Sequence, residues 1–512
     1  MRLGDLVDHG LAIAGADAVA IGDGRVRLTW SEYRERVSQL AAQLRRAGVA
    51  PGDRVAVHLP KSVDSFVSVH AILRAGAVMV PLDWFASAEF LRGVVDDAEP
   101  VALVSRARPN VIDEIVSGST VGVVVDPTAE PDAGGPAVDR GPAVVPVERD
   151  APAYIIYTSG STGRPKGIVH THHSAMAYAE LAVETYGLTH TDRLANIAPL
   201  QFDQSTFELY AAPLAGASVL VVPDGVMKFP ASLAKLVADD QVSVWYSVPY
   251  ALRQLVERGL TGELQLSELR WILYGGEVYP PEELRALMRA VPSARVSNVY
   301  GPAEVNQCTF HHLDEPPTSD SPVPIGRAWS GADVELVADD RRIDGVGVGE
   351  LWVASDTMMD RYWRGPDLTE QAVVTDHRVL GPGRWYRTGD LAERRDDGEL
   401  VFLGRVDNQI KVRGYRIELE AVEAAFIDAT GVDGCAAVVD TDGEQIVAMI
   451  DPVLDSDAVA ELRTAVRRRL PNHAVPGRIV AVERLPRTST GKVDRGAARR
   501  LLAEQHGIPP TQ

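Results

Sequence analysis

Short apolar runs alternate with amphipathic stretches along the first part of the chain, to about residue 299. Residues 31–47 place apolar side chains three or four positions apart, which predicts a helix with one buried face, and Ser31 is a candidate N-cap. The same pattern predicts further helices at 63–75 and 87–96 and strands at 54–59, 78–82, 101–104 and 154–157. No internal repeat of solenoid length is present. Alternation of this kind predicts stacked α/β layers.

Predicted strands dominate from Gly349 onward. The segments ELWVAS, GELVFLGR and IKVRGYRIEL have strand patterns, and Asp397-Gly398 is a typical hairpin turn. Beyond a boundary near 405–408, the pattern predicts helices at 418–429 and 457–470 and strands at 436–440 and 445–450. This length is enough for a small unit with its own core. We therefore expect an α/β protein with a large domain of stacked sheets and helices over 1–405 and a small α+β domain over 406–512.

The composition excludes several classes of protein. Lys and Arg number 51 against 71 Asp and Glu, and the net charge of −20 argues against general binding to nucleic acid or anionic lipid. The two cysteines, Cys308 and Cys435, cannot build a disulfide framework or a thiolate zinc cage. Neither a signal peptide pattern nor a run of roughly 18 apolar residues is present. We expect a cytoplasmic protein without a nucleic-acid or membrane partner.

A Gly, Ser and Thr loop, TSGSTGRPKG over 158–167, directly follows the predicted strand 154–157. Backbone N–H groups and hydroxyls in such a loop can surround a polyphosphate, and Lys166 adds a point charge. The loop lacks the Lys-Ser/Thr spacing of an ordinary P-loop. Taken alone, a flexible loop without function is an equally good interpretation.

Four further motifs carry groups that suit a nucleotide, although each has an ordinary structural alternative. Tyr300 and Glu304 lie in SNVYGPAE, where an aromatic ring can stack on a base and a carboxylate can bind Mg²⁺. Asp390 lies in YRTGDL, where it could accept ribose hydroxyls or terminate a turn. The remaining two motifs are the charged segment FLGRVDNQIKVRGYRIELEAVE over 402–423 and PRTSTGKVDR over 486–495, which presents Lys492.

Together and in this order, the five motifs resemble the adenylate-forming superfamily, which includes the adenylation domains of nonribosomal peptide synthetases, acyl-CoA ligases and luciferase-type enzymes. The resemblance extends over almost the whole chain. It implies a large N-terminal domain and a mobile C-terminal lid. It also implies that the enzyme activates a carboxylate with ATP and Mg²⁺ to an acyl adenylate and then transfers the acyl group to a thiol.

The resemblance implies a role for each motif residue. Lys492 would bridge the substrate carboxylate and the α-phosphate while charge develops in the transition state. Asp407 would be the hinge about which the lid rotates. The residues that would hold pyrophosphate are Thr158, Ser159, Gly160, Ser161, Thr162, Gly163 and Lys166. Those that would hold the rest of the nucleotide and the metal are Asn298 and Tyr300 for adenine, Asp390 and Arg405 for ribose, and Glu304 for Mg²⁺.

The motif around Tyr300 departs from the family pattern at one position. The family usually has Thr where this chain has Ala303, so a hydroxyl contact to the α-phosphate is missing. One neutral hydrogen bond contributes about 0.5 to 1.5 kcal/mol, which is too little to abolish catalysis while Lys492 and Lys166 remain. We therefore expect an active enzyme.

The segment FDQS at 202–205 resembles the branch of the family that activates amino acids. Its Asp203 would bind the substrate ammonium, because an ammonium in a dry pocket needs an anion close by. An N-cap role for Asp203 is the alternative. By the same resemblance, the residues that would line the side-chain pocket are Gln204, Phe207, Tyr246, Leu273, Gly275, Val299, Gln307 and Cys308.

The predicted pocket residues carry no formal charge, which favours a neutral substrate side chain. Tyr246 and Phe207 narrow the space, and Tyr246, Leu273 and Cys308 resemble residues of free-standing prolyl ligases. We rank proline-like or small neutral α-amino acids first. Gln307 does not fit this picture, since a buried amide needs a partner, and it leaves a polar substrate group or the shifted amine of a β-amino acid open.

The chain carries no carrier or condensation motif, so we expect a free-standing enzyme whose acceptor is the phosphopantetheine thiol of a separate carrier protein. Gly414 would line the passage for that thiol. One alternative is an acyl-CoA synthetase that uses free coenzyme A. The other is a non-catalytic adenylate-binding homologue, for which Ala303 is the only indication.

Overall fold

The computed structural model describes residues 1–129, 144–158, 165–262, 264–407, 409–429, 432, 434–440, 445–451, 453–487 and 493–505. Among these residues, one sheet has nine strands, and its middle strands pair in parallel. In sheet order these are β15 (Arg327–Ala328), β14 (Thr309–Leu313), β13 (Arg295–Tyr300), β12 (Trp271–Gly275), β11 (Val244–Ser247), β9 (Arg193–Asn196), β10 (Ser218–Val221), β1 (Val19–Gly22) and β2 (Arg27–Thr29).

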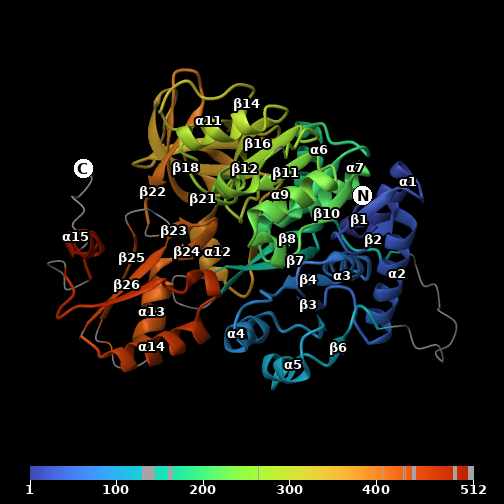
Figure 1. Ribbon diagram of the computed structural model, residues 1–512, viewed down its shortest axis with the longest axis horizontal. Helices are drawn as coiled ribbons and strands as arrows, with labels where there is room; N and C mark the ends of the chain where they lie inside the picture. Colours follow the sequence, from blue (N-terminus) through green and yellow to red (C-terminus); the bar gives the residue numbers. More distant parts are fainter. Residues whose placement is uncertain are drawn as a thin grey trace.

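A second sheet of seven described strands lies beside the first (Figure 1). It contains all four strands that the apolar runs predicted, each within two residues of the expected limits. In order the strands are β19 (Arg361–Tyr362), β8 (Lys166–Thr171), β7 (Pro152–Thr158), β4 (Val78–Pro81), β3 (Arg54–His58), β5 (Ala102–Ser105) and β6 (Val123–Val125).

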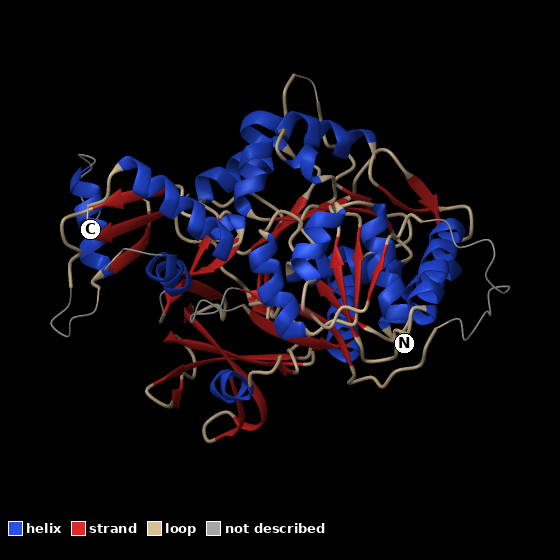
Figure 2. Cartoon of the chain, turned by 90° about the horizontal axis from the view of Figure 1, so that it is seen from below, coloured by secondary structure: helices blue, strands red, loops and turns tan. Residues whose placement is uncertain are grey.

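The two sheets share one core. Val57 and Tyr154 of the seven-stranded sheet belong to the same buried cluster as Val221 and Leu273 of the nine-stranded sheet. Figure 2 shows helices packed around these strands. They are α1 (Leu6–Ala14), α2 (Trp30–Arg46), α3 (Val63–Arg74), α4 (Ala88–Ala98), α5 (Pro109–Val116), α6 (His172–Tyr186), α7 (Ala212–Ala215), α8 (Asp224–Met227), α9 (Pro230–Asp239), α10 (Pro249–Gln254) and α11 (Pro281–Ala290).

The helix predicted at 31–47 is α2, but its expected N-cap is wrong. Thr29 caps the helix, and its hydroxyl accepts a hydrogen bond from the backbone N–H of Glu32. Glu32 Oε2 in turn accepts from the backbone N–H of Thr29 at 2.8 Å. This reciprocal capping box satisfies two N–H groups at once, whereas Ser31 lies inside the first turn and is exposed.

A third sheet follows, with helix α12 (Pro366–Ala372) beside it. The predicted hairpin at Asp397-Gly398 is confirmed, since it joins two antiparallel strands of this sheet and Gly398 has a φ of +82°. Such a φ suits glycine because no Cβ interferes. The strands are β17 (Arg341–Arg342), β16 (Ala332–Ala338), β18 (Gly347–Ser355), β21 (Gly381–Arg394), β20 (Val373–His377) and β22 (Leu400–Arg405).

The chain after Arg405 forms a separate unit with a core of its own. Phe426 and Ile450 lie in that core. The expectation of an α/β protein with a small C-terminal unit is confirmed, while the limits 1–405 and 406–512 stay a prediction. The elements are β23 (Gln409–Val412), β24 (Tyr415–Glu418), α13 (Leu419–Ala429), β25 (Gly434–Val439), β26 (Ile446–Asp451), α14 (Ser456–Arg469), β27 (Arg478–Ala481) and α15 (Arg495–Gln505). No described helix has the length and apolar character to cross a membrane.

Candidate active site

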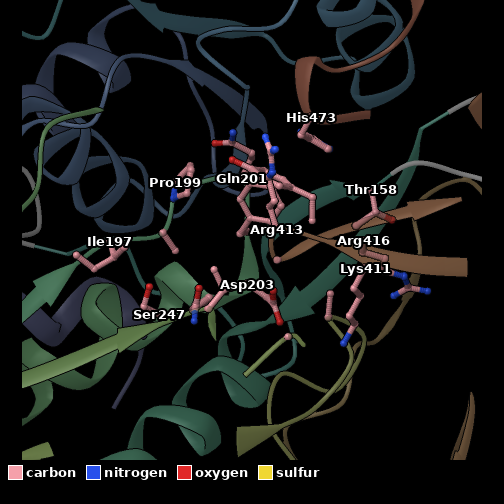
Figure 3. A pocket seen from close by; sticks show the side chains of 18 of the residues that line it. Thr158, Ile197, Pro199, Gln201, Asp203, Ser247, Lys411, Arg413, Arg416 and His473 are labelled. Carbon is pink, nitrogen blue, oxygen red and sulfur yellow. The ribbon is translucent and has the colours of Figure 1, made fainter. Parts of the chain in front are cut away.

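A cavity of about 600 Å³ lies between the large sheets and the hairpin β23–β24. Much of its wall comes from residues at or just after the carboxyl ends of strands: Thr158 of β7, Pro199 after β9, Ser247 of β11, Gly275 of β12 and Gly301 after β13. Figure 3 shows side chains from several of these segments converging on one space. Open α/β sheets bind ligands at this edge.

The hairpin β23–β24 closes the opposite side of the cavity with Lys411, Arg413, Gly414 and Arg416 (Figure 3). The backbone N–H of Gly414 donates to Glu277 Oε1 at 2.7 Å. Gly414 has a φ of +82°, and a Cβ there would lie 2.4 Å from Val248 Cγ1. The positive φ and the close contact with the Val248 side chain therefore both favour glycine at this position.

Asp203 lines the cavity and is a first candidate for binding a cationic group. Burial raises the pKa of Asp203 to about 6, while Lys411 acts in the opposite direction. The alternative N-cap role finds no support, because the π-helical turn η3 (Phe207–Ala211) begins after Thr206 and no described side chain caps it. A carboxylate in this setting suits a substrate ammonium, which would hold it ionised.

The other predicted pocket residues divide into two groups. Gln204, Tyr246 and Gly275 line the cavity together with Asp203. A Cβ on Gly275 would lie 2.5 Å from the Val299 carbonyl oxygen, so no other residue fits between β12 and β13. Five residues are at most 4 % exposed and do not line the cavity: Phe207, Leu273, Val299, Gln307 and Cys308.

Phe207 explains why part of the predicted lining lies deeper. Its ring packs edge to face against Tyr246 at 5.7 Å and against Tyr186 at 5.9 Å between ring centroids. Tyr246 therefore stands between Phe207 and the open space.

Asp390 and Arg405 occupy the other end of the cavity, where they face each other across β21 and β22. Arg405 Nη1 donates to Asp390 Oδ1 at 2.5 Å, and the Tyr300 hydroxyl donates to Asp390 Oδ2 at 2.5 Å. Tyr300 and Asn298 are buried, and Asn298 donates to the carbonyl of Pro324 at 2.7 Å. Three of the four nucleotide residues of the motifs thus form one hydrogen-bonded group.

Arg405 also holds the predicted hinge residue. Its Nε donates to Asp407 Oδ1 at 2.6 Å, and its Nη2 donates to Asp407 Oδ2 at 2.7 Å. Burial works against the Arg405 charge, but Asp407 and Asp390 raise the pKa of Arg405 above its usual value. Asp407 therefore lies at the junction of the two units, in contact with a cavity residue.

Glu304 is completely buried at the centre of a charged cluster. Its Oε2 accepts from Arg416 Nη1 at 2.6 Å, its Oε1 accepts from the Tyr362 hydroxyl at 2.7 Å, and Lys166 Nζ lies 3.8 Å away. Burial raises the pKa of Glu304, but the charges of Arg416 and Lys166 outweigh it and hold the pKa well below its usual range. Glu304 is thus ionised.

The cluster contains one carboxylate rather than a complete metal cage, and both of its oxygens already have partners, Arg416 and Tyr362. The described residues contain no group of three His, Cys, Asp or Glu placed to bind a metal. Mg²⁺ commonly binds one or two carboxylates plus substrate phosphates and keeps several waters. Glu304 therefore fits such a metal only once Arg416 has moved away from it.

Two predicted groups lie partly or wholly outside the described residues: Lys492 and the loop members Ser159, Gly160, Ser161, Thr162 and Gly163. The two ends of the loop, Thr158 and Lys166, pair across β7 and β8. Beyond the lysine, Arg495 Nη2 contacts Glu423 Oε2 at 2.6 Å. Helix α15 begins at that residue and lies far from β7 and β8 in Figure 1.

A second cavity of about 480 Å³ lies behind the hairpin. Lys166, Tyr362 and Glu418 are among its lining residues. Arg405, Gln409 and Arg416 line both cavities. The beginning of the smaller unit therefore forms the wall between the two spaces.

Sequence reasoning missed several residues of the site. Arg416 lies in the charged segment 402–423, but nothing in the sequence indicates that it reaches Glu304, 112 positions earlier. Tyr362 carries no motif at all. His170 Nε2 donates to the Ala303 carbonyl at 2.9 Å, and burial lowers the pKa of His170 to about 4, so it is neutral near pH 7. Only the fold brings these groups together.

Known proteins resemble the chain over nearly its whole length. A ligase named L-proline–[L-prolyl-carrier protein] ligase from Pseudomonas fluorescens is 35% identical over 497 residues, covering 94% of this chain and 96% of the relative. A ligase of the same name from Streptomyces coelicolor is 34% identical, covering 91% of each chain. The amide bond synthetase McbA from Marinactinospora thermotolerans superposes with a TM-score of 0.84 at 26% identity, covering 98% of this chain and 99% of that one.

Family profiles agree with these relatives and with the motifs. The profile described as AMP-binding enzyme matches residues 12–363, and the profile described as AMP-binding enzyme C-terminal domain matches residues 421–492. The first match contains the carboxyl-edge residues of the cavity up to Glu304, and the second follows the hairpin that closes it. This chain therefore belongs to the family of AMP-binding enzymes.

Proposed function

We propose that the protein is a ligase that uses ATP and Mg²⁺ to convert a neutral amino acid, proline-like or small, into an aminoacyl adenylate. It then transfers the aminoacyl group to the phosphopantetheine thiol of a separate carrier protein. The observation that carries this proposal is the position of Asp203 in one cavity with Asp390 and Arg405. An ammonium site and a ribose site at the two ends of one space suit an aminoacyl adenylate. The names of the two ligase relatives support both steps.

The nucleotide end would be bound mainly by side chains of the larger unit. Asp390 would accept the ribose hydroxyls while Arg405 keeps the carboxylate oriented, and Tyr300 would support the adenine. Glu304 and Lys166 would hold Mg²⁺ and the polyphosphate, and the metal would neutralise charge on the phosphates. Lys492 would stabilise charge on the transferring group after rotation of the smaller unit about Asp407. The main-chain carbonyl at Ala303 is already fixed by His170.

The thiol would enter between the hairpin and the larger unit. Gly414, Val248 and Tyr250 line the cavity on that side. A Cβ on Gly414 would lie 2.4 Å from Val248 Cγ1, so this side of the cavity is narrow and suits an unbranched arm better than a bulky group. Either a carrier protein or coenzyme A presents such an arm, so the acceptor needs a direct test.

The test of the first step is exchange of labelled pyrophosphate into ATP over a panel of α-amino acids, β-amino acids, fatty acids and aryl acids. We expect exchange with one or a few neutral amino acids. Exchange with fatty or aryl acids alone would show an acyl ligase and refute the amino-acid proposal. No exchange with any acid, from a protein that binds ATP, would show a non-catalytic homologue.

The test of the second step compares a holo carrier protein with coenzyme A at equal concentration. Mass spectrometry would detect the aminoacyl thioester on each acceptor. We expect the carrier to be loaded and coenzyme A to react slowly, if at all. Faster transfer to coenzyme A would show that coenzyme A, and not a carrier protein, is the acceptor. The proposal for the adenylation step would be unaffected.

A further inference from the structure

Uncharged polar groups gather at the blind end of the cavity, beyond Asp203. Tyr246 lines the cavity at this end, and a Cβ on Gly275 would lie 3.4 Å from its hydroxyl. Because Gly275 has no Cβ, the space next to that hydroxyl stays open. The wall therefore presents a hydroxyl at this point, next to open space.

Gln307 lies directly behind Tyr246. It is 4 % exposed, and neither of its amide atoms has a hydrogen-bond partner of normal geometry among the described residues. Burial and Asp203 raise the pKa of Tyr246 well above its usual value, whereas the nearby Gln307 lowers it. The amide is thus close to the hydroxyl and influences it. Buried amides are nearly always satisfied, so an unsatisfied one needs an explanation.

The neighbouring Tyr186 has the same character. Its hydroxyl is buried without a hydrogen-bond partner of normal geometry among the described residues, and burial raises its pKa while the nearby Ser297 lowers it, so the phenol is neutral. Both rings contact Phe207, which keeps them together. The buried polar groups of Gln307 and Tyr186 thus lie close to Tyr246, one of several hydroxyl-bearing residues that line the cavity.

We propose that the side-chain end of the cavity recognises a hydrogen-bonding group on the substrate side chain, through Tyr246 with Gln307 as its positioning residue. The substrate is then a compact neutral amino acid that carries a hydroxyl or an amide, rather than a pure hydrocarbon such as proline. This inference rests on the proposed function and narrows its substrate class. A site built to hydrogen-bond a substrate group discriminates strongly against an analogue without it, because the polar groups of the site are left unpaired.

The test is pyrophosphate exchange with pairs of similar shape: valine and threonine, alanine and serine, leucine and asparagine, and proline and 4-hydroxyproline. We expect the polar member of at least one pair to have a kcat/KM at least tenfold higher. Gln307→Met keeps the length of the side chain and removes the amide. This variant should reduce that preference about tenfold, mainly by raising the KM of the polar member.

Gln254→Met is the matched control, since Gln254 of α10 also lines the cavity but is not among the residues expected around the substrate side chain. It should change both members of a pair equally. If Gln307→Met does not fold, as judged by thermal unfolding, Tyr246→Phe takes its place because it removes only the hydroxyl. A merely structural role for Gln307 would reduce stability without moving the ratio between the two members.

Several outcomes would overturn the inference. One is exchange driven at least as well by the apolar members and unchanged by Gln307→Met or Tyr246→Phe. Another is a preference for β-alanine over alanine that Gln307→Met abolishes, because the polar group would then be the shifted amine. These outcomes would leave the proposed function intact. A panel in which no amino acid drives exchange would refute the proposed function itself.

Discussion

The two sides of the cavity are built differently. On one side, Ser247 and Gly275 end parallel strands whose neighbours are buried in a core shared by two sheets. On the other side, the hairpin β23–β24 meets the larger unit through a few local contacts: Arg416 with Glu304, Gly414 with Glu277, and the ring of Tyr415 against Phe202. A few local contacts separate more readily than a shared apolar core. The difference indicates that the larger unit fixes the substrate and the smaller unit is the part that can move.

The largest expected effect comes from the moving side. Lys492→Ala should reduce pyrophosphate exchange about 100-fold to 1,000-fold, because its contact would form in the transition state. ATP affinity, measured by calorimetry, should change little. Equal losses in exchange and in ATP binding would show that Lys492 acts in ground-state binding instead.

A substitution on the side formed by the larger unit should change the affinity for the amino acid. Asp203→Asn should raise the KM of the amino acid about 100-fold, since the ammonium would lose its buried anion. Unchanged KM would remove Asp203 from the binding site and with it the amino-acid proposal. ATP KM is the internal control, because Asp203 is not among the residues assigned to the nucleotide.

The pKa of Asp203 predicts a pH dependence for the KM of the amino acid. With a pKa of about 6 in the free protein, the carboxylate takes up a proton below that pH and loses its attraction for an ammonium. The KM of the amino acid should therefore rise about tenfold per pH unit below 6. Asp203→Asn should abolish this slope, and a slope that persists in the variant would assign it to another group.

Arg416→Gln tests the contact between the two sides. It leaves Glu304 buried beside Lys166 without its closest charge partner, so the docked hairpin should become less stable. We expect thioester formation to fall about tenfold and hydrogen exchange of the hairpin amides to speed up.

Arg413→Gln is the matched control on the same hairpin. Arg413 lies over the ring of Tyr250 at 5.4 Å and is exposed, so the loss of its charge should cost about 1 kcal/mol or less. Equal effects of the two variants would mean that overall hairpin charge, and not the pair with Glu304, holds the hairpin.

The smallest effect concerns acid stability. Burial lowers the pKa values of His58, His70, His170 and His172 in the larger unit to about 4. Among the described residues of the smaller unit, His473 is the one with such a shift. A histidine with a depressed folded pKa favours the folded state at neutral pH. That contribution is lost as the pH falls from about 6.5 toward 4, by about 1.4 kcal/mol per unit for each residue.

The larger unit should therefore lose stability first on acidification. Hydrogen exchange between pH 7 and 5, corrected for the intrinsic rate, would compare the two units in one experiment. Earlier loss of protection in 409–487 would contradict this expectation and place the weaker part in the smaller unit.

Local pattern predicted most of the framework and part of the site. Four strands of the seven-stranded sheet were visible as apolar runs, and Asp390 and Arg405 lie close because they are direct partners in the pairing of β21 with β22. The N-cap of α2 at Thr29 could also have been predicted from the sequence, because Glu32 follows Thr29 at the spacing of a capping box.

The remaining features depend on tertiary packing. The pair of Glu304 and Arg416 joins positions 112 residues apart, and no sequence period reports such a contact. Phe207 was expected in the lining from the family resemblance. The π-helical turn at Phe207–Ala211 is entirely buried, and its first ring points into the wall against Tyr246.

The wall shared by the two cavities has a consequence for how a reactive intermediate is kept. Arg405, Gln409 and Arg416 divide one volume into two chambers only while the hairpin is docked. A mixed anhydride in the front chamber is then sheltered from bulk water in the rear one. If the hairpin moves away, the two cavities become one space. The enzyme could then not retain the intermediate and release pyrophosphate at the same moment.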